Sequence, residues 1–253
     1  MQKMSLLFSI LLLIYTPCIA NAEIKTITAT QSCKMGDNDS RNEVLRICAI
    51  EAGNSVLKQA ASYVATLDAA KHYRLSPKEL KSYTAAALRV KTTDQKWSDM
   101  TVAMTAATDI DVDFVEKLIT RIKSDVPLQN QFNEQQQQKE ELERALAVIQ
   151  DKLKKSSFSE ADDLRTERNT AIGKIAVIET KKREIIDGII KKSLDAKKRI
   201  TVRMTMKNVK SLLGESDAQT YESPPDHGDK TFYVWYYGYT RIYFDGSNVA
   251  IIR

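Results

Sequence analysis

The chain of 253 residues is 43% hydrophobic and 28% charged, which excludes wholesale disorder and a protein built mainly of membrane-spanning helices. Its 8 glycines, 5 prolines and 7% aromatic residues are few for the many turns of a sandwich or barrel, so we expect a helix-rich chain. A formal net charge of +5 is small for this length and gives no indication of a nucleic-acid partner.

The first 22 residues have the features of a secretory signal peptide. Lys3 supplies a positive start, Leu6–Tyr15 is an apolar run, and Ala20–Ala22 (ANA) is a small-x-small cleavage site. The run is shorter than the roughly 20 residues that a membrane-spanning helix needs. We therefore predict an exported protein whose signal, residues 1–22, is removed together with Cys18.

Cys33 and Cys48 are the two cysteines that remain after this cleavage. An even pair in an oxidising compartment favours a disulfide, which would close a loop of about 15 residues and stabilise the fold by about 3 kcal/mol. The alternative is two free thiols, with Cys48 a small buried residue on a helix. The spacing of the pair matches neither a Cys-x-x-Cys redox site nor a zinc site.

Residues 23–128 are predicted to form a first domain with the element order β-α-α-β-β-α. A β-branched segment opens it, and apolar residues at steps of three and four follow from Ser40 onward. Ser76 and Pro77 have the pattern of a helix start, and two alternating segments then predict a hairpin before a last amphipathic helix. The predicted ranges are Ile24–Thr30, a helix from Ser40, Pro77–Leu88, Arg89–Trp97, Met100–Thr108 and Asp111–Ser124.

Residues 129–199 are predicted to form a helical spacer, because apolar residues recur at heptad steps and prolines are absent. Ser157 and Glu160 have the spacing of a capping box, which favours a turn and an antiparallel hairpin of two long helices. The alternative is one continuous helix that dimerises in parallel.

The end of this spacer is basic. Cations at this position could contact anionic lipid head groups or acidic wall polymers. They could equally form a solvated face that complements the negative end of a helix dipole. The predicted basic patch comprises Lys191, Lys192, Lys197, Lys198 and Arg199.

Residues 200–253 are predicted to form a small unit of one helix and an antiparallel sheet. Met206–Leu213 has a helix pattern, and strands are predicted at Thr231–Tyr237, Thr240–Phe244 and Asn248–Ile252. Alternation along the first strand separates two sets of aromatic side chains, and we expect the helix to cover one set while the other stays partly exposed. Exposed tyrosines are typical of protein-binding hot spots. We predict that partners bind this module through Tyr233, Tyr237 and Tyr239.

This unit carries short motifs in a fixed order: Ile200–Thr205 (ITVRMT), Leu213-Gly214, Trp235–Tyr237 (WYY) and Ile242–Val249 (IYFDGSNV). Their order and spacing resemble the BamE-type (SmpA/OmlA) domain of the bacterial outer membrane. That family has a glycine where Arg203 stands and a proline where Ser216 stands, and the family's lipid anchor is missing here. The resemblance implies a helix packed on an antiparallel sheet and a place among periplasmic proteins that assemble the outer membrane.

The first domain has a looser resemblance to the amino-terminal domain of the flagellar accessory protein FlgT. The features in common are the alanine-spaced helix around Ala49 and Ala60 and a hairpin that leads to Asp111–Val115 (DVDFV) at a helix start. This likeness implies no chemistry.

Few residue patterns suggest catalysis. His72 and His227 are the only histidines, and the chain has no Gly-x-Ser-x-Gly elbow, glycine-rich phosphate loop or cluster with metal-ligand spacing. Closely spaced aspartates such as Asp111 and Asp113 are best interpreted as helix N-terminal charges. We therefore expect no enzyme activity, no cofactor and no metal.

These features together predict an α+β, non-enzymatic periplasmic protein, peripheral to the outer membrane. It would act as an interaction or scaffold module in outer-membrane protein assembly or maintenance, with the spacer holding the BamE-like unit away from the first domain. Its expected partners are envelope proteins. The alternative is a lipid- or cell-wall-binding accessory protein of flagellar or other envelope machinery.

Overall fold

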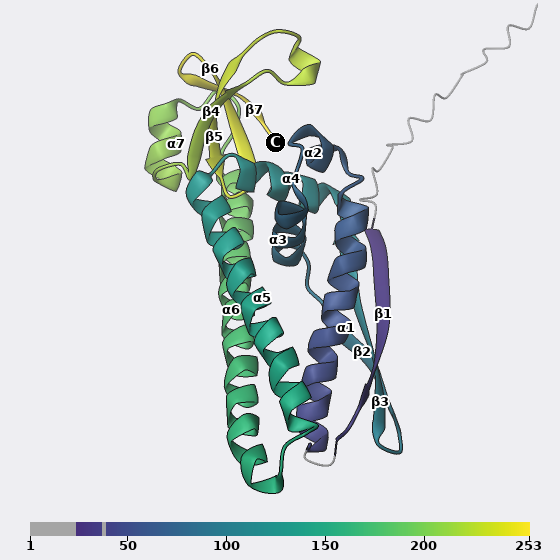
Figure 1. Ribbon diagram of the computed structural model, residues 1–253. Coiled ribbons are helices and arrows are strands. Elements are labelled where there is room, and N and C mark those ends of the chain that lie inside the picture. The colour runs from purple at the N-terminus through teal and green to yellow at the C-terminus, as the bar shows by residue number, and fades with distance from the viewer. Residues whose placement is uncertain (1–23, 37–38) are drawn as a thin grey trace, which may run out of the picture.

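The computed structural model describes residues 24–36 and 39–253, and the predicted signal peptide lies outside them. The architecture is α+β, as predicted, with two antiparallel sheets joined by long helices (Figure 1). None of the helices within the described residues is long and apolar enough to cross a membrane.

The first sheet is three-stranded, with the order β1-β3-β2, and α1 covers one of its faces. Side chains on β3 alternate between buried and half-buried, because one face packs on α1 while the other lies open. On α1 a stripe of alanine and valine lies against the sheet, and these small side chains let the helix approach closely. The elements are β1 (Ile24–Lys34), α1 (Arg41–Val64), β2 (Lys91–Ser98) and β3 (Thr101–Asp111).

Three further helices complete the first domain. They are α2 (Asp68–His72), α3 (Pro77–Ala87) and α4 (Val112–Lys123). The Ser40/Glu43 pair caps α1 and the Ser76/Glu79 pair caps α3 with reciprocal hydrogen bonds. The predicted order β-α-α-β-β-α lacks α2 and is corrected here, because a five-residue helix without a side-chain cap leaves no periodic signal.

The second half of the chain begins with the predicted antiparallel hairpin of α5 (Val126–Leu153) and α6 (Phe158–Arg199). At 1.5 Å per residue the helices span about 42 Å and about 63 Å, so α6 extends well beyond the start of α5. Glu160 accepts hydrogen bonds from the backbone N–H and the hydroxyl of Ser157, as the capping box predicts.

The hairpin packs along the first domain and does not hold the two ends of the chain apart. Arg168 on α6, 1% exposed, forms ion pairs with Asp39 at 2.5 Å and Glu43 at 2.9 Å near the start of α1. Burial raises the pKa of Glu43, but hydrogen bonds from Ser40 and the contact with Arg168 outweigh it and lower the pKa to about 2. The expected spacer geometry is therefore corrected: apolar faces of α5 and α6 are buried against α1 and α4.

The carboxyl-terminal unit is a four-stranded antiparallel sheet with the order β4-β5-β6-β7, covered on one face by α7. It lies at the end of α6, beside α2 and α4 (Figure 1). Strand β4 precedes the predicted first strand and was not expected from the sequence. The elements are α7 (Met206–Leu213), β4 (Ala218–Glu222), a short 3-10 turn (Pro225–His227), β5 (Phe232–Tyr237), β6 (Thr240–Asp245) and β7 (Asn248–Ile252).

The sheet is attached to α6 through the turn between β5 and β6. Ser193 on α6 accepts a hydrogen bond from the backbone N–H of Tyr239 at 2.6 Å, and the Ser193 carbonyl oxygen accepts one from the hydroxyl of Thr240 at 3.2 Å. Gly238 has φ +60° and lies so close to α6 that a Cβ atom would overlap the carbonyl oxygen of Ile189. Both the turn conformation and the close approach therefore require glycine at this position.

Cys33 on β1 and Cys48 on α1 face each other with their Cα atoms 5.8 Å apart, in the geometry of a disulfide. The pair would link the edge strand of the first sheet to the helix that covers it. Free cysteine at position 48 would also fit, since Cys48 is fully buried beside Val102 and Met104.

We predict that Gly238→Ala destabilises the protein more than Gly246→Ala does. Gly246 has φ +59° but open space around its Cα, so alanine there should lower the free energy of unfolding by about 1 kcal/mol through backbone strain alone. At Gly238 the overlap with α6 adds to this strain, and the loss should reach about 3 kcal/mol or more. Urea unfolding of both variants measures the difference, and equal losses would contradict the close approach.

Candidate functional site

The described residues contain no group of three or more histidine, cysteine, aspartate or glutamate side chains that could hold a metal ion. His72 packs edge-on against Tyr73, with ring centroids 4.8 Å apart. His227 packs in the same way against Phe232 at 5.5 Å. Each histidine therefore contacts an aromatic ring.

The three tyrosines predicted to bind partners do not form one surface. Tyr237 is 3% exposed, and its hydroxyl donates a hydrogen bond to the carbonyl oxygen of Gly214 at 2.8 Å. Tyr239 points toward the first domain, where its ring lies 5.9 Å from that of Phe114. Tyr233 is half-buried. The prediction is corrected for Tyr237, which is buried; Tyr239 is half-buried, and its ring packs against the first domain.

The sheet face opposite α7 is also buried. Phe232, Val234, Tyr236 and Tyr243 are all buried on this face. Lys230 lies over the ring of Phe232 at 5.1 Å and Arg253 over the ring of Tyr243 at 5.9 Å, so cationic side chains cover these aromatic rings. The expectation that this face stays partly exposed is therefore wrong.

Glu222 organises the polar groups on that closed face. Its carboxylate accepts hydrogen bonds from the hydroxyls of Tyr236 and Tyr243 and pairs with Arg241 at 3.2 Å. Burial and the negative charge of Glu222 raise the pKa of Tyr236, and burial is also the main cause of the raised pKa of Tyr243. Because both tyrosine hydroxyls and the Arg241 guanidinium bind the Glu222 carboxylate, the network joins β4, β5 and β6 and stabilises the sheet.

Exposed aromatic surface remains at the outer edge of the sheet, on β4. Tyr221 is 70% exposed, and its ring stacks at a tilt on Tyr233 with centroids 5.0 Å apart. Tyr233 in turn contacts Trp235, whose Nε1 is buried without a hydrogen-bond partner among the described residues. We call the exposed backbone edge of Ala218–Glu222, together with Tyr221 and Tyr233, the β4 edge. Sequence analysis missed it because β4 itself was not predicted.

Some residues of the predicted basic patch have partners within the chain, and others have none among the described residues. Lys192 pairs with Asp217, Arg199 pairs with Asp195 at 3.1 Å, and Lys197 lies 5.7 Å above the ring of Tyr239. Lys191 and Lys198 are exposed, and neither has an ion-pair partner within the described part of the chain. Between them on α6 lies Leu194, which is 58% exposed. The free part of the patch thus combines two lysines with one apolar side chain.

A buried polar cluster lies where the hairpin meets α1 and α3. Lys182, whose side chain is 2% exposed, donates a hydrogen bond from Nζ to the side-chain oxygen of Gln136 at 3.0 Å. Lys139 pairs with Glu179 at 2.8 Å and lies between two cavities of 640 and 520 Å³. Burial lowers the pKa of Lys182 to about 8, although Glu179 opposes this effect. The cluster pairs its own charges and joins α5 to α6.

Comparison with known protein families, with curated proteins and with solved structures finds no match to this chain. Its geometry and sequence motifs are therefore the basis for inferring a function.

We predict that Lys182 makes stability rise with pH in the alkaline range. Its pKa is about 8 in the folded protein and near 10.5 when unperturbed, so between these values the unfolded chain binds more protons than the folded one. The free energy of unfolding should therefore increase from pH 8 to pH 10.5 by up to about 3 kcal/mol from this group.

The measurement compares chemical unfolding of wild type and Lys182→Met between pH 7 and pH 10. As the pH rises, the free energy of unfolding of wild type should increase relative to that of Lys182→Met. Groups that titrate alike in both proteins cancel in this difference. Lys181→Met, an exposed neighbour on α6, is the control and should follow wild type. A constant difference between wild type and Lys182→Met would contradict the prediction.

Proposed function

We propose that this protein is a non-enzymatic periplasmic scaffold that binds extended segments of envelope proteins at the β4 edge. The observation that carries the proposal is an edge strand, unpaired on its outer side, that carries the exposed Tyr221 stacked on the half-buried Tyr233. An edge strand presents backbone N–H and C=O groups on which a further strand can form.

The aromatic pair adds apolar contact to this backbone recognition. Tyr221 and Tyr233 lie opposite each other in the register of β4 and β5 and share one face of the sheet. Tyrosine provides a large apolar surface with a polar tip and few rotatable bonds, and it is enriched among interface hot spots. A partner strand added to β4 would place alternate side chains next to this pair.

The rigid attachment of the sheet favours such a role. Hydrogen bonds at Ser193 and the close approach of Gly238 fix the sheet on α6, which in turn packs on the first domain. A binding edge held in one orientation loses less conformational entropy when a partner binds.

The assignment to the outer-membrane assembly system rests on the BamE-type resemblance and the signal-like leader. One structural detail supports the resemblance: Arg203 adopts φ +75°, the backbone region that favours glycine, at the position where the family has glycine. The backbone at Arg203 thus has a conformation that glycine adopts without strain. The proposed partners are therefore envelope proteins, including outer-membrane assembly components.

We predict that Tyr221→Ala weakens partner binding by about 2 kcal/mol, roughly a thirtyfold rise in dissociation constant, because it removes an exposed hot-spot ring. The fold should be unaffected, since Tyr221 is 70% exposed. A photo-reactive residue at position 221 should cross-link partners in intact envelopes, and binding of those partners to the purified variant gives the affinity.

Ile24→Ala is the matched control, because Ile24 is 64% exposed on the edge strand of the other sheet. It should bind partners as wild type does. Tyr237→Ala should instead destabilise the protein by about 3 kcal/mol or more, as expected for a buried aromatic residue. Unchanged binding by a folded Tyr221→Ala protein would rule out the β4 edge.

A second candidate function is binding to an anionic lipid surface or wall polymer. The supporting observation is the exposed Leu194 between the unpaired Lys191 and Lys198, a combination that suits insertion beside anionic head groups. Only this part of α6 would take part, because the other basic residues of the patch have partners within the chain.

We expect the triple variant Lys191→Glu/Leu194→Ser/Lys198→Glu to lose flotation with phosphatidylglycerol vesicles if this second function operates. Each cation near such a surface contributes about 1 kcal/mol, so reversal of two should reduce binding by well over tenfold. The same variant should retain partner binding at the β4 edge. Wild-type protein that does not float at low salt would exclude the lipid function.

A further inference from the structure

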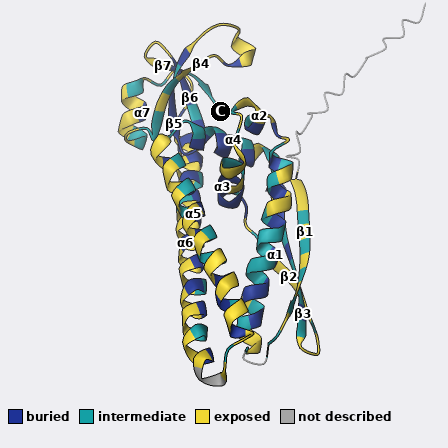
Figure 2. Ribbon diagram, viewed as in Figure 1, coloured by how far each residue is buried: buried dark blue, intermediate teal, exposed yellow. Residues whose placement is uncertain are grey.

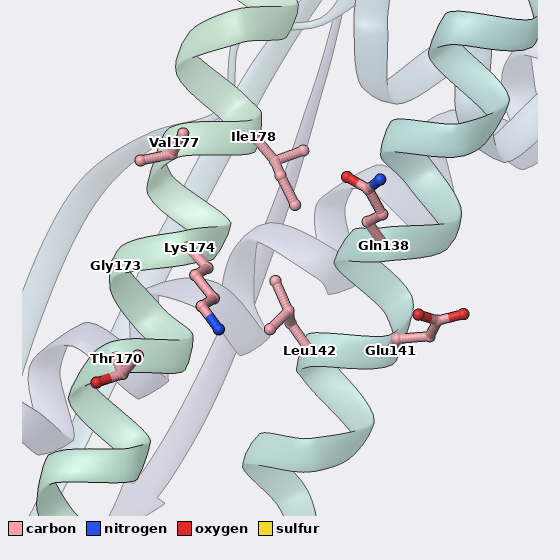
Figure 3. A pocket seen from close by; sticks show the side chains of 8 residues that line it. All are labelled: Gln138, Glu141, Leu142, Thr170, Gly173, Lys174, Val177 and Ile178. Atoms are coloured by element: carbon pink, nitrogen blue, oxygen red, sulfur yellow. The ribbon is translucent and has the colours of Figure 1, made fainter.

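A groove runs between α5 and α6 on the side of the hairpin away from α1. Its volume is 660 Å³, and Leu142 from α5 and Ile178 from α6 point into it (Figure 3). Val177 on its rim is 53% exposed, and Gly173 has open space around its Cα. This is an apolar strip on a surface helix pair that nothing within the described chain covers.

The charges beside the groove have opposite signs on the two helices. Glu141 on α5 is exposed and hydrogen-bonded only to Gln137, and Lys174 on α6 is exposed without an ion-pair partner among the described residues. Other charged residues of the hairpin, such as Lys139 and Arg168, are instead paired with a residue of opposite sign within the described chain. Glu141 and Lys174 are therefore available to charges of opposite sign on another surface.

We propose that two copies of this chain associate through this groove, about a two-fold axis that runs along the hairpin. Such an axis places α5 of one copy against α6 of the other, so that each Glu141 meets Lys174 of the second copy. An axis across the hairpin would instead place α5 on α5 and bring the two Glu141 carboxylates together, which like-charge repulsion disfavours. The charge pattern thus selects one arrangement, an antiparallel four-helix bundle with the small residue Gly173 at the contact.

Charge reversal tests this arrangement directly. Sedimentation equilibrium of the purified protein, from about 1 to about 100 µM, should show a monomer–dimer equilibrium for wild type. Glu141→Lys and Lys174→Glu should each raise the dissociation constant by about tenfold or more, since each places like charges together twice in the dimer. The double variant Glu141→Lys/Lys174→Glu restores opposite charges and should recover the wild-type dissociation constant.

Lys207→Glu is the matched control, because Lys207 is exposed on α7 and the substitution changes the net charge as Lys174→Glu does. It should dimerise as wild type does. In a second measurement, Glu141→Cys protein is mixed with Lys174→Cys protein and oxidised. The mixture should form the mixed disulfide dimer, whereas Glu141→Cys mixed with Lys207→Cys should not.

A wild-type protein that stays monomeric up to about 100 µM would overturn the proposal. So would single variants that dimerise as wild type does, or a double variant that remains as weak as the single ones. None of these outcomes bears on the β4 edge, which lies on a different element and is tested by partner binding.

Discussion

Burial of apolar side chains between the first domain and the hairpin is the interaction on which the rest of the structure depends. Ala60 from α1, Leu118 from α4, Phe132 from α5 and Ile189 from α6 all belong to one buried cluster. A buried isoleucine or phenylalanine stabilises a fold by about 2 to 3 kcal/mol, so this cluster outweighs any single ion pair along the surface. It fixes α6 in position, and α6 fixes the carboxyl-terminal sheet.

The buried polar contacts add to this apolar packing, which remains the main source of stability. Arg168 near one end of the hairpin and Lys182 near its middle are both buried, and each has a partner of opposite charge or a hydrogen-bond acceptor. Removal of a partner would leave a buried charge unpaired, which costs far more than the pair contributes. The helices must therefore pack so that these buried groups meet their partners, while the apolar cluster supplies most of the stabilisation. Buried, half-buried and exposed residues follow one another along both helices of the hairpin (Figure 2).

Long periodic elements could be predicted from the sequence, because their signals are local. The stripe on α1, the capping boxes at Ser40, Ser76 and Ser157, and the alternation on β5 all lie within a few residues of one another. Strand β4 could not be predicted because its alternation is inverted: Tyr221 points to solvent while Glu222 points inward. That inversion is stable only because Tyr236, Tyr243 and Arg241 reach Glu222 from neighbouring strands, which no local pattern reveals.

The sequence could predict the residue type at the candidate site, tyrosine, but not which tyrosine stays exposed. Alternation correctly separated the two faces of β5, but it could not show that Lys230 and Arg253 cover one face or that Tyr239 meets Phe114 in the first domain. These contacts join residues that are far apart in the chain. The tyrosine that remains exposed, Tyr221, lies on the strand that sequence patterns missed.

The shared apolar cluster also has a consequence for the order in which the protein folds. Residues of α1 are made early, yet their cover on α6 comes much later, and the Arg168–Asp39 pair joins residues 129 positions apart. Contacts between distant segments slow folding, because the intervening chain must first be brought together. As the chain is made, the apolar face of α1 would therefore stay exposed until α6 follows, and such exposed apolar surface makes a folding intermediate prone to aggregation.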